Sequence, residues 1–375
     1  MHFLYMKNCK KIRLYLLCNL VFYFMVVGCG DGDWCGTVSE EITVSYEDMQ
    51  IKRLNIPRHL LPEFSAKSVE KQVQVRLLKP GAPDILGEFE VSDEFVVFTP
   101  LVPFRPGLEY EVIYRQQPLD TVNTSRPKGY PAPFVLAIFP TRDSLPENLL
   151  KLYIRFSWPM QEGVSAEHIK LVKDGRDTLQ DVFLNLQPEL WNPERTVLTL
   201  WFDPGRIKRD LQPNKLMGPP LEANTRYSIV ITPGWQDTNG FAIEEAFKKD
   251  FITIRRDNAS PDPDKWLIFP PGARSREFLQ MDMYESLDYQ LLYNSLRIVD
   301  SKGKEVPGKI FVQSNETTWR VQPAENWRAG NYTIEIESKL EDLAGNNLNR
   351  LFDTDLTQQQ NKKQAKVYRK VFSVR

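Results

Sequence analysis

The sequence is poor in the residues that most often carry metal binding or catalysis. Its 375 residues include 3 histidines and 4 cysteines, and none of these stands in a His-x-x-x-His or Cys-x-x-Cys spacing. Zinc sites are usually built from such closely spaced ligands. A Gly-x-Ser-x-Gly elbow and a phosphate-binding glycine loop are missing too. The sequence therefore predicts no metal, no cofactor and no catalytic residues. A pair of glycosidase carboxylates stays open, because distance in space defines it.

An excess of one charge sign is also missing. Lys+Arg number 48 and Asp+Glu number 49, so the formal net charge is -1. Nucleic-acid binding needs a dense basic surface that displaces counterions, so no nucleic-acid partner is expected. Hydrophobic content of 42% and 27 prolines indicate a foldable chain of short strands and fixed turns. The length suits two or three domains.

The N-terminus carries basic residues between Lys7 and Arg13, followed by an apolar run from Leu14 to Val27. This run is shorter than the roughly 20 residues that span a bilayer, and its length is typical of a signal peptide. It ends in Val-Val-Gly-Cys at Cys29, which resembles the bacterial lipobox. The resemblance implies a signal peptide over 1–28 and a lipid on Cys29 that anchors the chain to a membrane. A plain secretory signal with an incidental cysteine is the alternative.

The remaining cysteines allow no disulfide framework in the mature chain. Cys9 and Cys18 lie in the predicted signal peptide, which leaves Cys35 without an intramolecular partner. Residues 29–40 are predicted to be a tether, and its Gly30–Asp33 stretch resembles the acidic tag of surface lipoproteins in Bacteroidetes-type bacteria. The expected location is the cell envelope, with the outer membrane or cell surface favoured.

Two segments share a strand pattern followed by an Asp-x-x-Gly tetrapeptide. The matching residues are Tyr227, Asp237 and Gly240 in one copy and Tyr332, Asp342 and Gly345 in the other. The Tyr-x-Ile-x-Ile pattern predicts a half-buried strand. Each Asp is predicted to cap a turn in which the Gly takes a positive φ. Calcium binding is the competing interpretation, but too few acidic residues stand nearby in the sequence for such a site.

The repeat extends upstream of these turns. Leu152–Phe156 corresponds to Leu279–Met283, and Ile169–Val172 corresponds to Leu296–Val299. A weaker copy contains Val75–Leu78 and Tyr110–Tyr114, and it has no Asp-x-x-Gly turn. Asp257 to Asp264 is polar and proline-rich, as linkers are. The predicted fold class is therefore all-β, with tandem immunoglobulin-like β-sandwiches over 41–130 (divergent), 131–256 and 257–375.

Phe156–Met160 reads Phe-Ser-Trp-Pro-Met, which resembles a signature of the bacterial Ig-like domain of S-layer and other surface proteins. Tyr332 to Asn346 resembles the closing hairpin of that domain. The wider run from Phe139 to Asp353 is similar to uncharacterised Ig-like proteins of Planctomycetes and Bacteroidetes. The resemblance implies fold and surface location and brings no catalytic residues. The third repeat departs from it at Ser286-Leu287.

Three further features complete the sequence-based predictions. The insertion around Gly205–Pro220 carries Arg206, Lys208 and Arg209, and it is expected to be a solvated loop whose basic residues could meet an acidic polymer. Glu244–Lys249 could form a turn or two of helix. The tryptophans, which could stack on sugars, are expected to fill cores or cover loops instead; those considered are Trp158, Trp191, Trp201 and Trp235.

Together these patterns predict a non-enzymatic, lipid-anchored envelope protein whose sandwiches act as a spacer or binding module for a protein or polysaccharide. The alternative is a hydrolase or enzyme accessory with a site between the second and third domains. A deep pocket with converging carboxylates there would favour the enzyme, whereas shallow grooves would favour the binding module.

Overall fold

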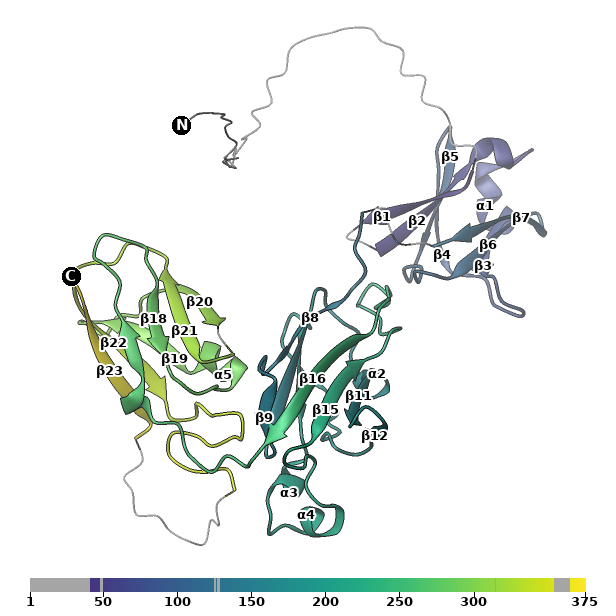
Figure 1. The fold of residues 1–375 in the computed structure, drawn as a ribbon. Helices are drawn as coiled ribbons and strands as arrows, with labels where there is room; N and C mark the ends of the chain where they lie inside the picture. Colours follow the sequence, from purple (N-terminus) through teal and green to yellow (C-terminus); the bar gives the residue numbers. More distant parts are fainter. Residues whose placement is uncertain (1–40, 48–49, 125, 127–128, 314, 354–364) are drawn as a thin grey trace, which may run out of the picture. The chain divides into compact units, whose positions relative to one another are not determined.

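A computed structural model describes residues 41–47, 50–124, 126, 129–313, 315–353 and 365–375 (Figure 1). The predicted signal peptide (1–28), the tether (29–40) and Cys29 lie outside the described residues. Strands dominate, and the longest helices have six residues. Within the described ranges, no helix is both long and apolar enough to cross a membrane.

The first sandwich, purple to blue in Figure 1, pairs a four-stranded sheet of order β1-β2-β5-β4 with a three-stranded sheet of order β3-β6-β7. Its elements are β1 (Thr43–Glu47), β2 (Gln50–Pro57), η1 (Arg58–Leu60), η2 (Ala66–Ser68), α1 (Val69–Gln72), β3 (Val73–Leu77), β4 (Gly87–Val91), β5 (Phe95–Pro100), β6 (Glu109–Tyr114) and β7 (Gln117–Asn123).

The second sandwich has sheets of order β13-β14-β10-β8 and β12-β11-β15-β16-β9. Its elements are β8 (Val135–Phe139), β9 (Ser144–Pro146), β10 (Lys151–Phe156), α2 (Ser165–His168), β11 (Ile169–Lys173), β12 (Asp177–Leu179), β13 (Leu190–Trp191), β14 (Val197–Trp201), α3 (Pro204–Ile207), α4 (Gln212–Met217), β15 (Arg226–Ile231) and β16 (Phe247–Ile254).

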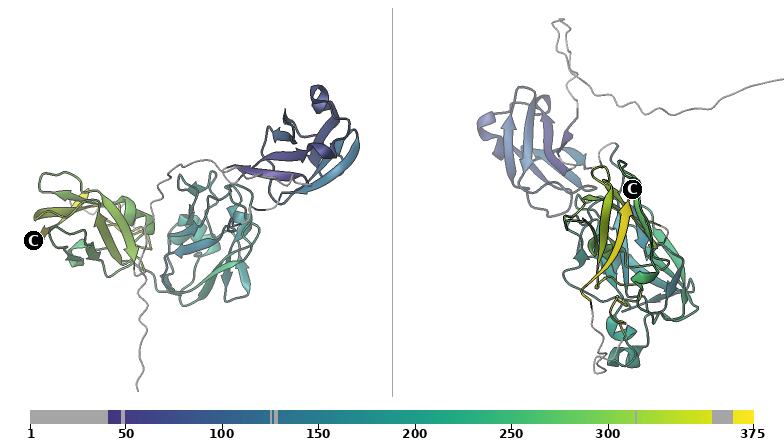
Figure 2. Two further views of the ribbon diagram at one scale, coloured as in Figure 1. Left: turned by 90° about the horizontal axis from the view of Figure 1, so that it is seen from above. Right: turned by 90° about the vertical axis from the view of Figure 1, so that its left-hand side faces the viewer.

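The third sandwich has sheets of order β17-β18-β21-β20 and β19-β22-β23. Figure 2 shows the paired sheets of all three sandwiches from two further directions. The elements of the third are η3 (Pro263–Lys265), β17 (Leu267–Phe269), β18 (Leu279–Asp282), α5 (Tyr289–Asn294), β19 (Leu296–Asp300), β20 (Gly308–Gln313), β21 (Thr318–Pro323), β22 (Gly330–Glu337) and β23 (Val367–Val374).

All three units share one strand order. If the strands of each are lettered in the usual way, one sheet reads A-B-E-D and the other contains C-F-G, which is the arrangement of an immunoglobulin-type sandwich. The second unit adds a short A′ strand, β9, which runs parallel to β16. The prediction of an all-β fold with tandem Ig-like sandwiches is confirmed. The first unit has the same strand order although its sequence copy is weak.

Alternation of apolar and polar residues explains how each core forms. In β15 the side chains of Tyr227, Ile229 and Ile231 are buried, and in β22 those of Ile334 and Ile336 are fully buried. Alternate residues of a strand point to opposite faces, so each strand presents one apolar face to its partner sheet. Each sandwich encloses its own cluster of buried apolar side chains.

The third repeat departs from the Phe-Ser-x-Pro-Met pattern in sequence but keeps the same backbone pairing at this position. Met160 forms a bridge to Asp237, and Leu287 forms the equivalent bridge to Asp342. Both apolar side chains are fully buried. Leu287 therefore occupies the place that Met160 holds in the second repeat.

The expected helix at Glu244–Lys249 is wrong. Phe247–Ile254 forms β16, which pairs along its length with β15. Its core-facing side is mixed, because Lys249 stands between Phe247 and Phe251 on that side. This break in the apolar alternation hid the strand in the sequence.

Candidate functional site

The Asp-x-x-Gly turns are hydrogen-bonded caps. The Oδ1 atom of Asp237 accepts the backbone N–H groups of Asn239 and Phe241 at 2.8 and 2.9 Å. The Oδ1 atom of Asp342 accepts those of Ala344 and Asn346 at the same two distances. Gly240 and Gly345 have φ of 86° and 80°, in the left-handed region that favours glycine. How much these turns stabilise the fold stays a prediction.

Each turn also holds the segment that leads into its own sandwich. Tyr130, which precedes the second sandwich, donates its hydroxyl to Oδ2 of Asp237 at 3.1 Å. Asn346 donates its side-chain amide to Oδ2 of Asp342 at 2.8 Å and to the carbonyl of Asp257, which precedes the third sandwich, at 3.4 Å. The second carboxylate oxygen thus links the turn to the incoming linker.

The same turns approach the preceding sandwich closely. A Cβ atom on Gly345 would come within 2.3 Å of Leu150 Cδ2, and one on Gly240 within 3.0 Å of Pro106 Cδ. Leu150 N–H also donates to the carbonyl of Leu343 at 2.9 Å. Sequence spacing identified these residues as local turn caps, but it gave no signal for this second contact.

A buried charged network joins the second and third sandwiches. Lys151 on β10 lies 2.7 Å from Glu341 and 3.2 Å from Asp288, measured from Nζ to the carboxylate oxygens. Tyr153 on the same strand donates its hydroxyl to Asp288 at 2.6 Å. Asp288 also accepts the N–H of Leu291 and so caps α5. Burial opposes the charge on Lys151, but the two carboxylates outweigh it and raise the pKa of the ammonium.

Aromatic stacking covers this network. The rings of Phe139 and Tyr289 stack with centroids 3.7 Å apart and an interplanar angle of 11°. Tyr289 also touches Tyr153 and Tyr293. On the other side of the network, the ammonium of Lys151 lies 4.7 Å from the ring centre of Trp201. Aromatic rings therefore pack against the charged groups of the junction.

The junction has carboxylates but no room for a substrate. The cavity bounded by Lys151, Tyr153, Asp288 and Glu341 has a volume of only about 10 Å³. A single water molecule needs roughly that much. The two carboxylates converge, as an enzyme site there would require, yet Asp288 is bound by Lys151 and Tyr153, and Glu341 is bound by Lys151.

A second contact lies beside this network. Glu316, almost fully buried in the turn between β20 and β21, accepts the backbone N–H and the hydroxyl of Thr141. Burial raises the pKa of the Glu316 carboxyl, and the hydrogen bonds from Thr141 oppose this. Arg142 donates to the hydroxyl of Ser286 at 3.2 Å. The β8–β9 connection is thereby fixed to the third sandwich.

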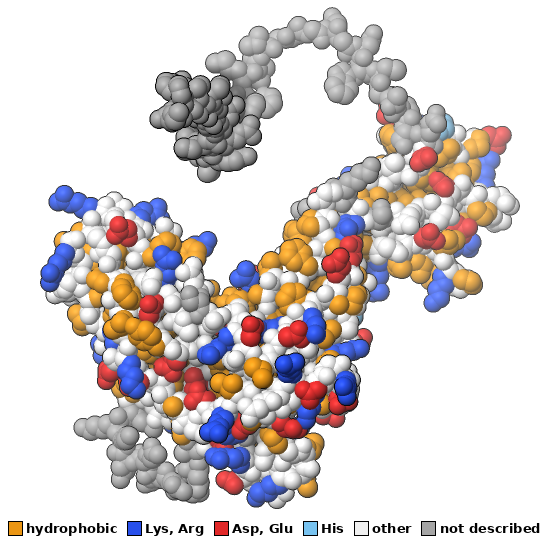
Figure 3. Space-filling view, viewed as in Figure 1, with side chains coloured by type: hydrophobic (Ala, Val, Ile, Leu, Met, Phe, Trp, Pro, Cys, Tyr) orange, Lys and Arg blue, Asp and Glu red, His pale blue; other side chains and the backbone are white. Residues whose placement is uncertain are grey.

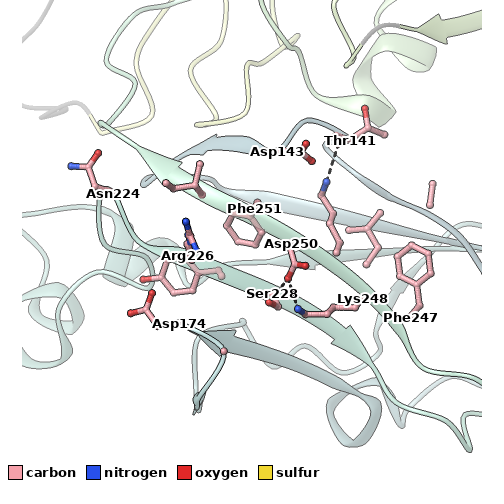
Figure 4. A pocket seen from close by; sticks show the side chains of 16 residues that line it. Thr141, Asp143, Asp174, Asn224, Arg226, Ser228, Phe247, Lys248, Asp250 and Phe251 are labelled. Atoms are coloured by element: carbon pink, nitrogen blue, oxygen red, sulfur yellow. Dashed lines mark hydrogen bonds and ion pairs between the residues drawn. The ribbon is translucent and has the colours of Figure 1, made fainter.

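A broad groove of about 1370 Å³ runs along β16 (Figure 4). Residues of β15 and β16 form one side of it, and the β8–β9 connection forms the other. Lys249 reaches across the strand edge and donates to the carbonyls of Thr141 and Arg142 at 2.9 and 3.3 Å. Burial lowers the pKa of Lys249. The polar lining residues include Asp143, Asp174, Asn224, Arg226, Ser228, Lys248 and Asp250.

The edge of β16 is only partly paired. The parallel strand β9 pairs with Ile252–Ile254, and the described residues provide no strand beside Phe247–Phe251 on that edge. Lys248 and Asp250 border this open stretch and form an ion pair of 2.8 Å. Charged side chains of this kind discourage edge-to-edge association with other sheets. The rim of the groove is therefore charged along this open stretch.

The groove contains a hydrogen-bonded Ser–Asp pair. Ser228 donates its hydroxyl to Asp250 at 2.5 Å. Hydrogen bonds from Lys248 and Ser228 lower the pKa of the Asp250 carboxyl, which makes it a weak base. The face shown in Figure 3 mixes both charge signs with scattered apolar side chains. The lining of the groove also carries side chains of both charge signs, among them Asp143, Arg226 and Lys248.

The long insertion is not the free basic loop expected from sequence. The guanidinium of Arg206 is buried and donates to the carbonyls of Asp181 and Gly218 at 2.8 and 3.0 Å. Arg209 pairs with Asp353 at 3.1 Å, and Lys208 lies over the ring of Phe352. Sequence reasoning missed this because nothing in the sequence marks which of three adjacent basic residues turns inward.

The remaining candidates are structural in the described part of the chain. No group of three His, Cys, Asp or Glu side chains there could hold a metal ion. Trp235 is fully buried against Phe156, with His168 stacked on it at 5.5 Å between ring centroids. Trp158 packs on Tyr130. Trp191 and Trp201 pack against the core of the second sandwich, as expected.

No protein-family model matches the chain, and neither does any curated protein. Solved structures show low similarity. The N-terminal part of the bacterial S-layer protein SbsC has 11% identity and a TM-score of 0.23, with coverage of 55% of this chain and 40% of that one. This chain thus spans less than half of the S-layer structure.

Two other structures match at a similar level. The Ig1-2 module of the Drosophila receptor protein tyrosine phosphatase DLAR has 12% identity and a TM-score of 0.21, covering 56% of this chain and 93% of that one. The MG0-NIE-MG1 part of Escherichia coli alpha-2-macroglobulin has 12% identity and a TM-score of 0.22, covering 82% and 96%. At such scores the Ig-like architecture rests on this chain's own strand order.

Proposed function

We propose that the chain is a lipid-anchored protein of a bacterial cell envelope, in which tandem Ig-like sandwiches form a stiff, non-enzymatic spacer that presents a binding groove. The observation that carries the proposal is the buried junction built by Lys151, Tyr153, Asp288 and Glu341. A spacer keeps its reach only if its modules do not swing, and interdomain motion is the default unless the interface is apolar and well packed.

An enzyme site at this junction is the competing hypothesis. It requires space beside Asp288 and Glu341, and the cavity there has about 10 Å³. Both carboxylates also have partners in Lys151 and Tyr153. These two observations favour a structural role for the charged network.

Stiffness can be measured by double electron–electron resonance. In a Cys29→Ser, Cys35→Ser background, spin labels are placed at Thr178 and Lys309, which lie on β12 of the second sandwich and β20 of the third. A narrow distance distribution is expected, and it should broaden in a Tyr289→Ala variant that removes the stacked ring. A broad distribution in the unaltered junction would contradict the spacer proposal.

The lipid anchor rests on the basic N-terminus, the short apolar run and the Val-Val-Gly-Cys sequence at Cys29. Expression with and without Cys29→Ser, followed by membrane fractionation and intact-mass measurement, tests it. The membrane form should exceed the mass of residues 29–375 by a diacylglyceryl group. Membrane attachment that survives Cys29→Ser would argue against this anchor.

The groove along β16 is proposed to take a protein or polysaccharide partner through its mixed polar lining. Charge reversal at the rim, Lys248→Glu, is expected to weaken capture of an envelope ligand, whereas Lys309→Glu on the third sandwich serves as the matched control. Equal effects of both substitutions would place the binding surface elsewhere.

A further inference from the structure

The second sandwich contains a cavity that the proposed function does not use. It has a volume of about 200 Å³ and lies between the segment that follows β12 and the core. Apolar side chains form its walls, and five of them belong to the buried core of this sandwich: Ile169, Leu171, Val182, Leu198 and Leu200. An engineered cavity of roughly 150 Å³ with similar walls stays dry and binds benzene.

The cover of the cavity is fixed by hydrogen bonds to neighbouring segments. The carbonyl of Asp181 accepts from the buried Arg206, and the carbonyl of Val182 accepts from the N–H of Asp203. Leu184 donates its N–H to the backbone carbonyl of Trp201 at 2.8 Å. A cavity held open in this way needs little reorganisation to receive a ligand.

The mouth of the cavity combines exposed leucine side chains with polar amide side chains. Leu184 and Leu190 are 38% and 41% exposed there, although both are large apolar side chains. Gln180, Asn185 and Gln187 also line the site and are exposed. Their amides can donate to or accept from a hydroxyl or N–H on a ligand.

The charge at the site selects against anions. Glu189 lines the cavity and accepts the N–H groups of Gly163, Ser165 and the Trp191 indole, each at 2.8 Å. Burial acts to raise the pKa of Glu189, but these hydrogen bonds outweigh it and the pKa is lowered. The carboxylate therefore stays ionised beside the cavity and repels a negatively charged ligand.

We propose that this cavity binds the aromatic ring of an uncharged small molecule, with a hydroxyl or N–H of that molecule directed to the amides at the mouth. The volume, the leucine and isoleucine walls and the charge of Glu189 together define this class. The inference does not depend on the spacer function, because it concerns one sandwich alone.

Titration of the mature chain with indole, followed through the leucine methyl resonances, tests the proposal. Saturable shifts are expected for Leu171, Leu198 and Leu200. The substitutions Leu184→Trp and Gln180→Trp should close the mouth and weaken binding by about tenfold or more, which corresponds to about 1.4 kcal/mol. Leu267→Trp is the matched control, because Leu267 is 49% exposed on β17 of the third sandwich, and it should bind indole as the unaltered chain does.

The proposal fails if indole gives no saturable shift up to its solubility limit, or if its affinity is unchanged in both mouth variants. Gln180 is exposed, so its variant keeps the test valid if Leu184→Trp fails to fold. Benzyl alcohol and benzoate then separate charge from shape. Benzyl alcohol should bind more tightly, and equal binding of the two would refute the assignment to uncharged ligands.

Discussion

Tyr153 and Asp288 face each other across the boundary between two sandwiches, with the tyrosine hydroxyl 2.6 Å from Oδ2 of the carboxylate. The residues are 135 positions apart in the sequence. Both are almost fully buried. Desolvation raises the pKa of the Tyr153 hydroxyl, and the Asp288 charge raises it further, so the tyrosine stays protonated and donates. This pair belongs to a boundary that combines stacked aromatic rings with buried ion pairs and hydrogen bonds.

Removing the Asp288 carboxylate should therefore make the second and third sandwiches unfold independently of each other. Asp288→Ala leaves Lys151 as a buried charge with one partner, Glu341. It also leaves the buried Tyr153 hydroxyl without its acceptor, and a buried polar group that loses its partner costs about 1–3 kcal/mol. We expect a lower midpoint in urea and separate transitions for the second and third sandwiches. Arg297→Ala, which removes an exposed ion pair with Glu335, should leave the midpoint unchanged. A single transition at the original midpoint would contradict the assigned role of Asp288.

The pH dependence of stability should report on Asp342. Burial raises the pKa of this carboxyl from 3.8 to about 7 in the folded chain. Between these values the folded state binds the proton and the unfolded state has released it, so the free energy of unfolding falls as pH rises. The contribution is fully present below about pH 4, is lost as pH approaches 7, and amounts to a few kcal/mol.

Urea unfolding at several pH values between 4 and 7 measures this slope. Asp342→Asn should flatten it, because the amide does not titrate in this range. Asp300→Asn is the control, since backbone hydrogen bonds from Lys304 and Lys302 lower the pKa of Asp300, so that it titrates below the window. An unchanged slope in Asp342→Asn would contradict this assignment and attribute the pH dependence to other carboxyls with raised pKa values, such as Glu316.

The strand pattern made the fold predictable. Tyr-x-Ile-x-Ile runs and their spacing to Asp-x-x-Gly are local features of the sequence. A half-buried strand can be predicted from the alternation of apolar and polar residues alone. The sequence therefore predicts β15 and β22, together with the upstream strands of the repeat, in which β10 corresponds to β18 and β11 to β19. The sequence does not predict β16, because Lys249 interrupts the apolar side of the strand. The Lys249 side chain donates to the carbonyl of Thr141, which lies more than a hundred residues away in the sequence.

The junction could not be predicted for a related reason. Lys151, Tyr153, Asp288 and Glu341 are ordinary polar residues at the ends of strands and turns, and only the folded chain brings them together. A charged residue in sequence is normally assigned to the solvated surface, since charged side chains are rarely buried without partners. Their partners are here supplied by a different sandwich, which no local pattern encodes.

Arg206 should contribute strongly to the stability of the second sandwich. Its guanidinium satisfies carbonyls of Asp181 and Gly218 that would otherwise lose their partner. Arg206→Ala is expected to lower the free energy of unfolding by about 3 kcal/mol, since buried acceptors without donors are costly. Arg209→Ala removes a pair in which the arginine is 64% exposed, and it should cost less than about 1 kcal/mol. Equal losses in urea unfolding would show that Arg206 is not the anchor of the insertion.

Gly345 should tolerate substitution less than a glycine of the same conformation elsewhere. Gly345 and Gly303 have φ of 80° and 78°, so alanine pays a similar backbone cost of roughly 1–2 kcal/mol at both. A Cβ at Gly303 meets nothing within 4 Å, whereas one at Gly345 meets Leu150 of the preceding sandwich at 2.3 Å. Overpacking of this kind adds about 1–3 kcal/mol. Gly345→Ala should therefore unfold at clearly lower urea than Gly303→Ala. Measured against Leu150→Ala alone, adding Gly345→Ala should not cause this additional loss of stability, because the shorter side chain at position 150 gives the new methyl group room. If both single variants lose the same stability, the turn does not press against Leu150 in solution.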